Sequence, residues 1–284
     1  MTLVALFRRE FIEHRGAFFY APLILLGLFL FGTALSIAGN RIEIPGAVGA
    51  PTSLRIYQLG FLLITQLWWW YLLLTLFFYY ADAFSADRRN NAMLFWKSMP
   101  VSDFTMLASK MLSGMLVFPA IIFLVALASG IAFYLVTALG VFVMPGFSVP
   151  DPLAAARIFL DVAELAGVEF VLGILWFAPF FAWVGALSTV FRRWSIPLSI
   201  LVPVILALLE NAAFFGSIPT GGYIWTYLSW RLQFGPNWEI LFAWLMAESP
   251  TVDLLQVALL DRIDGLQLAG GLVVAAVLVY LASL

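Results

Sequence analysis

Six apolar segments are the feature that most limits the folds open to this chain. They lie at residues 17–38, 59–83, 111–138, 168–191, 196–215 and 265–284. Each reaches the ~20 residues that an α-helix needs to cross the hydrocarbon core of a bilayer. Only 11% of the 284 residues are charged, whereas about 25% is usual in a soluble domain. The sequence predicts an all-α integral membrane protein, with six transmembrane helices in one membrane domain over residues 1–284.

The basic residues are divided unevenly between the two sides that six spans define. The side of both termini carries most of the 14 lysines and arginines. Its members are Arg8, Arg9, Arg15, Arg88, Arg89, Lys97, Lys110, Arg192 and Arg193. Short loops that carry Lys and Arg stay on the cytoplasmic side of a membrane. Both termini are therefore predicted to be cytoplasmic.

Residues 2–15 precede the first span and predict a short amphipathic helix on the cytoplasmic surface. On a helical wheel, Leu3, Val4, Phe7 and Phe11 share one arc, and charged residues lie outside it. An elbow helix with a functional role and a plain positive-inside anchor both fit this pattern.

Short helices are also expected between the spans. Asp151 and Pro152 fit the N-cap and the first position of a helix ahead of the fourth span. In the last outer loop, residues 237–248 and 251–262 follow a run of Trp and Tyr, which favour the membrane interface. Both segments are too short to span, so they are predicted to be interfacial or re-entrant helices in the outer leaflet.

The sequence lacks the common motifs of catalysis and nucleotide binding. No G-x-x-x-x-G-K-[ST] phosphate-binding motif occurs. His14 is the only histidine and there is no cysteine, so a zinc site of His or Cys ligands cannot be built. We find no G-x-S-x-G motif, no carboxylate pair inside the membrane, and no basic stripe suited to nucleic acid. We expect a non-enzymatic chain without a cofactor or nucleic-acid partner, in which His14 is an interfacial residue.

Glu210 is the charged residue that the segments place inside the membrane, because Asp82 and Glu169 fall at the very ends of theirs. A carboxylate inside a membrane is costly and is by default a functional hypothesis. Glu210 lies near the outer end of the fifth span, where it can also reach the interface, so a polar site and a structural role both stay open. Trp68–Trp70 lie near mid-membrane, and at least one ring is expected to face a neighbouring helix, a cavity or a subunit interface.

The loop 82–110 combines basic residues with an apolar patch where water is expected. An exposed apolar patch with a charged rim is typical of a docking surface for another protein. Pro100 ends one predicted helix, and Ser102 with Asp103 can cap a second helix that runs through Lys110 into the third span. The patch consists of Met93, Leu94, Phe95 and Trp96.

Residues 87–102, DRRNNAMLFWKSMPVS, resemble the cytoplasmic loop of bacterial ABC-2 type transporter permeases. The predicted elbow helix, six spans, cytoplasmic termini and helices in the last outer loop also agree with that family. The resemblance implies the transmembrane permease subunit of an ABC exporter in the bacterial cytoplasmic (inner) membrane. It further implies a dimer with a second permease copy or a paralogue, and two copies of a separate ABC ATPase that binds ATP and Mg.

In that family the loop acts as a coupling helix, which contacts the ATPase. Carried over to this chain, the contact falls on Arg88, Arg89, Met93, Leu94, Phe95, Trp96 and Lys97. One departure is that the chain ends at Leu284, inside its sixth apolar segment, without the basic tail usual in such permeases. Whether a tail is missing stays open.

A membrane protein that works without an ATPase is the competing interpretation. It could be a secondary transporter or a structural subunit of a membrane complex. A secondary transporter predicts an inverted repeat and ionisable groups at the membrane midplane. Apart from Glu210, the sequence shows neither feature. The substrate is not indicated by the sequence.

Overall fold

The computed structural model describes residues 3–39, 53–89, 102–139, 148–191, 194–214, 222–235, 239–240, 243–244 and 252–283. The regular elements within these ranges are helices. They are α1 Leu3–Arg15, η1 Gly16–Tyr20, α2 Ala21–Ala38, α3 Ser53–Arg89, α5 Asp103–Leu112, η2 Ser113–Val117, α6 Phe118–Leu139, α7 Pro152–Phe191, α8 Ser195–Ala213, α9 Gly222–Leu232, α11 Val252–Leu260 and α12 Gly265–Ala282.

Within the described part of the chain, six helices are long and apolar enough to cross a membrane, which confirms the number expected from the sequence. They are Val4–Ser36, Ser53–Phe84, Asp103–Leu139, Pro152–Phe191, Ser195–Ala213 and Gly265–Ala282. Large apolar side chains remain exposed on them, among them Leu28, Leu67, Leu124 and Leu208. Such a surface suits lipid rather than water as solvent, so the helices have the character of a multi-pass membrane protein.

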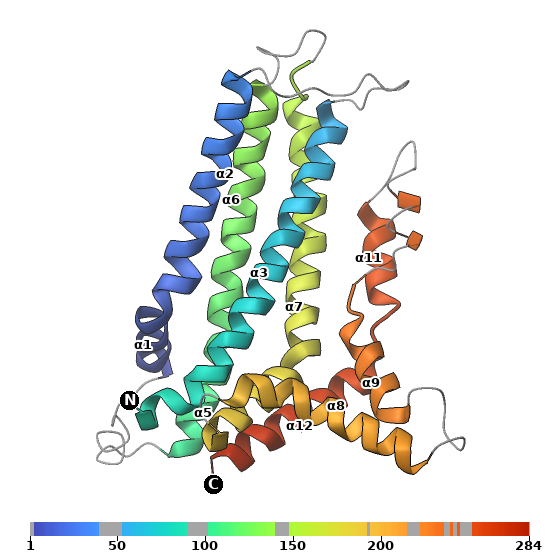
Figure 1. Ribbon diagram of the computed structural model, residues 1–284. Helices are drawn as coiled ribbons and strands as arrows, with labels where there is room; N and C mark the ends of the chain where they lie inside the picture. Colours follow the sequence, from blue (N-terminus) through green and yellow to red (C-terminus); the bar gives the residue numbers. More distant parts are fainter. Residues whose placement is uncertain are drawn as a thin grey trace.

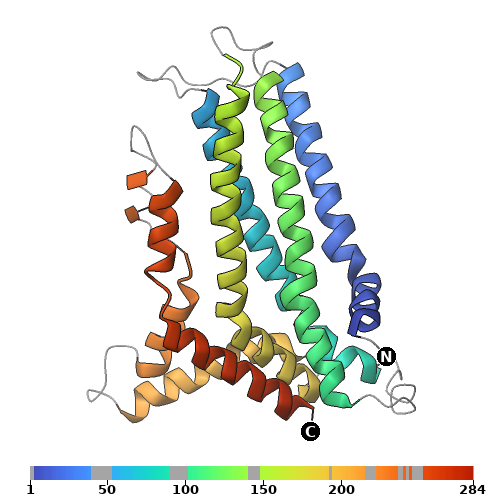
Figure 2. The same ribbon diagram turned by 180° about the vertical axis from the view of Figure 1, so that it is seen from behind.

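The helices α2, α3, α6 and α7 run side by side as a bundle (Figures 1 and 2). Buried side chains of α3, α6 and α7 form its core, including Leu72, Leu76, Phe118, Ile122 and Phe170. Both termini lie at one end of the bundle, and α8 and α12 lie across that same end rather than beside the other helices. The C-terminal part of α7 also turns across this end. The helix contains Pro179, and a proline inside a helix removes a backbone hydrogen bond and can bend the axis.

The N-terminal helix is joined to the first span by η1, a π-helical turn in which the Ala21 amide donates to the Gly16 carbonyl. Val4 on the predicted apolar arc is 73% exposed, whereas Leu6 and Glu10 are buried against the bundle. The helix therefore contacts its neighbours through a face different from the apolar arc. A second π-helical turn, η2, joins α5 to α6.

Two helix starts agree with their sequence signals. The Asp151 carboxylate accepts a hydrogen bond from the Ala154 amide at 2.9 Å, as expected of an N-cap. The helix that it starts, however, does not end before the fourth span but continues for 40 residues to Phe191. The side chain of Ser102 accepts from the Thr105 amide and caps α5 in the same way.

The described part of the segment between α8 and α12 is helical where expected, and it contains one further helix. The helix α11 lies within the predicted segment 251–262, but α9 forms over residues for which no helix was expected. Of the predicted segment 237–248, only residues 239–240 and 243–244 lie within the described part of the chain, and both pairs are helical.

Of the three consecutive tryptophans, Trp68 and Trp69 are buried and Trp70 is exposed. The Trp68 indole N–H donates to the Ser129 hydroxyl at 3.0 Å, and Trp69 is buried against Phe170 and Phe234. Trp70 points outward and is 64% exposed. Two rings thus face neighbouring helices, as expected from their spacing, and the third faces the surroundings of the bundle.

Close contact between α3 and α7 depends on Gly173, because a Cβ atom there would overlap the Trp69 ring. We expect Gly173→Ala to lower the free energy of unfolding by about 1–3 kcal/mol, the usual cost of overpacking a core. Gly32, on α2, has nothing within 4 Å of a built Cβ. Gly32→Ala should be neutral or stabilising by up to ~1 kcal/mol, because alanine favours the helix. Unfolding in detergent micelles measures the stability of both variants. Equal changes in the two would contradict the close contact assigned to Gly173.

Candidate functional site

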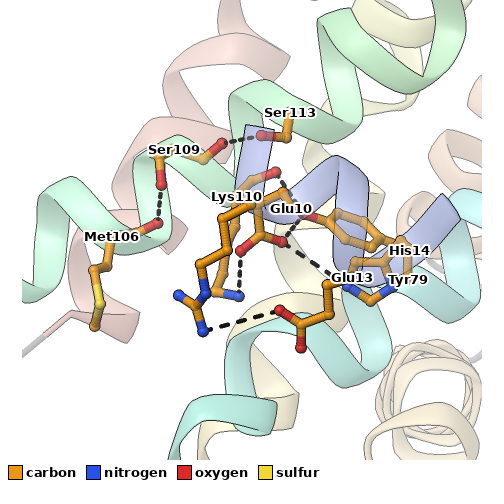
Figure 3. A network of polar contacts seen from close by, with 9 residues as sticks. Glu10, Glu13, His14, Tyr79, Met106, Ser109, Lys110 and Ser113 are labelled. Carbon is orange, nitrogen blue, oxygen red and sulfur yellow. Dashed lines mark hydrogen bonds and ion pairs between the residues drawn. The ribbon is translucent and has the colours of Figure 1, made fainter. Parts of the chain in front are cut away.

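A buried cluster of polar side chains lies where α1, α3 and α5 meet (Figure 3). Glu10 comes from α1, Tyr79 from α3 and Lys110 from the last turn of α5. All three side chains are buried. The cluster lies toward the end of the bundle that carries both termini, and α5 follows the loop for which docking is predicted. We call these three residues the joint.

The joint contains a buried ion pair whose charged groups all have partners. The Lys110 ammonium donates to Glu10 Oε1 at 2.8 Å. The Tyr79 hydroxyl lies 3.1 Å from Glu10 Oε2 and 3.1 Å from the Lys110 carbonyl oxygen. Both carboxylate oxygens of Glu10 are therefore engaged, and one tyrosine contacts both halves of the pair.

His14 lies beside the joint and contacts two of its residues. Its Nε2 lies 3.9 Å from Glu10 Oε2, and its ring meets the Tyr79 ring edge-to-face with 4.8 Å between centroids. The His14 ring also packs edge-to-face on Phe118. His14 thus lies between the N-terminal helix and the bundle, where it shields the ion pair.

The joint holds three helices in one arrangement. Buried charges are stable only when paired, and removing one partner leaves the other charge uncompensated. Since the charged groups are nearly inaccessible and mutually satisfied, they are suited to fixing α1, α3 and α5 together and not to chemistry on a substrate. Any displacement of α5 must move Glu10 and Tyr79 with it or break the pair.

The predicted docking residues are only partly described. Arg88 and Arg89 form the end of α3, but their side chains lie outside the described residues. The rest of the set, Met93, Leu94, Phe95, Trp96 and Lys97, also lies outside them. The predicted ATPase contact stays a prediction, although its position is bracketed by α3 and α5.

Glu210 binds the N-terminus of α9. Its Oε1 accepts from the Tyr223 amide at 3.1 Å, and its Oε2 accepts from the Ile224 amide at 2.8 Å. A carboxylate at a helix N-terminus satisfies orphan amides and interacts favourably with the helix dipole. Of the two roles left open by the sequence, the geometry supports the structural one, and it explains why α9 starts where it does.

Glu169 is an intramembrane carboxylate that the sequence analysis set aside as the end of a segment. Because α7 begins at Pro152, Glu169 instead lies near the middle of a continuous helix. It is 4% exposed, and Gln66 on α3 donates its side-chain amide to Glu169 Oε2 at 2.6 Å. The sequence does contain a signal for this position. If the helix that starts at Asp151 and Pro152 is taken to continue into the fourth span, Glu169 falls inside it.

Arg231 is a second buried charge that the sequence analysis placed in the outer loop. It is 1% exposed and lies between α7, α9 and α12. Its Nη2 donates to the Trp176 carbonyl at 3.0 Å and its Nη1 to the Gln267 carbonyl at 3.2 Å. In return, the Trp176 indole N–H donates to the Arg231 carbonyl at 2.7 Å. The guanidinium also lies over the Trp176 ring, 4.7 Å from its centroid.

Comparison of the chain with protein-family models, curated proteins and solved structures gives no match. Within the described ranges, no three His, Asp or Glu side chains lie close enough together to hold a metal ion.

Proposed function

We propose that this chain is the transmembrane permease subunit of an ABC exporter in the bacterial cytoplasmic membrane. Two copies of a separate ATPase bind and hydrolyse ATP with Mg. They contact Arg88, Arg89 and residues 93–97, and they are coupled to the permease through the loop 87–110. A second permease copy or a paralogue completes the dimer. The observation that carries the proposal is the buried joint of Glu10, Tyr79 and Lys110, because Lys110 lies in α5, the helix that follows the docking loop in the sequence.

The position of the joint suits the transmission of force. The loop that carries Phe95 and Trp96 leads into α5, and α5 ends in the turn that bears Lys110. Through the ion pair, a push on the loop would reach α1 and α3 together. A rigid connection of this kind is what a permease without its own nucleotide site needs, because its energy comes from a partner.

To test docking, Phe95 and Trp96 are both replaced by alanine, and co-purification with candidate ATPases is measured. We expect binding to fall by at least about tenfold, because aromatic anchors at the centre of an interface commonly contribute ~2 kcal/mol or more each. Val149→Ala is the matched control. Val149 is an exposed apolar residue just before the start of α7. This start lies at the end of the bundle away from the two termini, so the loss of the Val149 side chain should leave binding unchanged.

The same samples are assayed for transport-coupled ATP hydrolysis. Coupling should fall together with association in the double variant. If the double variant still binds the ATPase and still couples ATP hydrolysis to transport as the wild type does, the proposed function is wrong.

An ATPase-independent transporter is the second candidate, favoured by the burial of Glu169 between α3 and α7, inside the bundle. Ionisable groups at such depth are typical of ion-coupled carriers. Reconstitution of the purified chain alone in vesicles separates the two candidates. Substrate movement without any ATPase would support the second and exclude the first.

A further inference from the structure

The contact between α3 and α7 contains a buried carboxylate, Glu169, whose polar partner among the described residues is the neutral Gln66. Glu169 lies about 26 Å along α7 from Pro152, at ~1.5 Å per residue. Gln66 lies about 20 Å along α3 from Ser53 on the same rise. Both residues are therefore well inside their helices, where water is scarce.

The surroundings of Glu169 are apolar. Leu165, Ala166 and Gly173, one helical turn to either side, are buried. The next residue, Phe170, packs against the Trp69 ring with 5.4 Å between centroids. Neighbours of this kind cannot solvate a negative charge.

No described residue supplies a counter-charge. The helices α3, α6, α8, α11 and α12 and the turn η2 all pack against α7. Within the described ranges, none of them brings a charged or titratable side chain to Glu169, whose polar contact is the neutral amide of Gln66. On α7 itself, the nearest acid, Glu164, accepts instead from Gln256 of α11 at an exposed position.

We propose that Glu169 is a proton-binding site inside the helix bundle, and that Gln66 is its positioning donor. An isolated carboxylate in an apolar site is far less stable than the neutral acid. The site therefore takes up one proton to form the carboxyl group. The Gln66 amide holds Oε2 in place. The site does not depend on an ATPase partner.

Infrared difference spectroscopy of the purified full chain in lipid vesicles tests the site directly. The spectrum of the wild type minus that of Glu169→Gln should contain the C=O stretch of a protonated carboxyl group at neutral pH. Glu164→Gln, the matched control on the same helix, should instead show carboxylate bands. Carboxylate bands for Glu169 at neutral pH would overturn the proposal.

A second measurement uses the wild-type chain and needs no substitution. Dicyclohexylcarbodiimide, an apolar reagent, adds to a protonated carboxyl group. The acid proton moves to one reagent nitrogen, the oxygen bonds the central carbon, and the acyl group then shifts to the nitrogen, so the adduct keeps every atom of the reagent. Peptide mass spectrometry should find the adduct on Glu169 at neutral pH. Labelling that appears only under the acidic conditions that also label Glu164 would count against the site.

The role of Gln66 has its own readout. Gln66→Leu removes the hydrogen bond that favours the charged carboxylate, so labelling of Glu169 should persist to higher pH than in the wild type. Gln256→Leu, which removes the corresponding amide from Glu164, should leave the labelling of Glu169 unchanged. An unchanged pH profile in Gln66→Leu would show that Gln66 does not position the site.

Discussion

Replacing Lys110 with alanine is expected to lower the free energy of unfolding by about 3–5 kcal/mol, the usual cost of removing one partner of a buried ion pair. The reason is that Glu10 would be left buried, with Tyr79 as its remaining close partner in the joint. Unfolding of the purified chain in detergent micelles, followed by circular dichroism, measures the change. No other single substitution discussed for this protein should have a larger effect.

Two controls separate the buried pair from charge effects in general. Arg9 and Glu13 form an ion pair at 3.9 Å within α1, and both side chains are about one-third exposed. Arg9→Ala should therefore cost no more than about 0.5 kcal/mol, as is usual for a surface pair. The double variant Glu10→Gln/Lys110→Met removes both charges. It should lower the free energy of unfolding by less than Lys110→Ala alone. A loss below ~1 kcal/mol for Lys110→Ala would contradict the assigned geometry.

Arg231→Ala is expected to be the second most damaging change, at about 3 kcal/mol. It removes the donors to the buried carbonyl oxygen of Trp176 and the partly buried one of Gln267, and leaves a space beside Gly271. Thermal unfolding in micelles measures the loss. A near-neutral result would mean that α9 is held to α7 and α12 by other contacts.

Lysine should not rescue the Arg231 site. Its single ammonium cannot match a planar guanidinium that bonds in two directions while it lies over the Trp176 ring. Arg157→Ala is the matched control, because Arg157 is an exposed arginine on α7, and its removal should change stability by no more than about 0.5 kcal/mol. Rescue by Arg231→Lys would reduce the role of Arg231 to its charge.

The signals that predicted the fold correctly are local ones. Apolar length identified the six helices, and the caps at Ser102 and Asp151 follow from residue types within one turn of the chain. The long-range pairs could not be found in that way. Glu10 and Lys110 are separated by 100 residues in the sequence, and Gln66 and Glu169 by 103. Their pairing depends on how the helices pack, which no local pattern records.

The misplacement of Glu169 has a simple physical cause. Hydropathy marks the part of a helix that is apolar enough for lipid, and it stops at the first polar residue. The helix itself is governed by backbone hydrogen bonds and continues through such residues, as α7 does from Pro152 to Phe191. Arg231 was misjudged for the related reason that a charge in a polar, aromatic segment was assumed to face water.

A π-helical turn follows each of the two helices that carry the ion pair of the joint. Glu10 lies on a helix that reaches its span through η1, and Lys110 lies on one that reaches its span through η2. A π turn closes a wider ring than an α turn, and such single turns occur often at functional sites. The ion pair ties α1 to α5 just before the π-helical turn of each helix. The first and third spans therefore share one point of attachment, although they are far apart in the sequence.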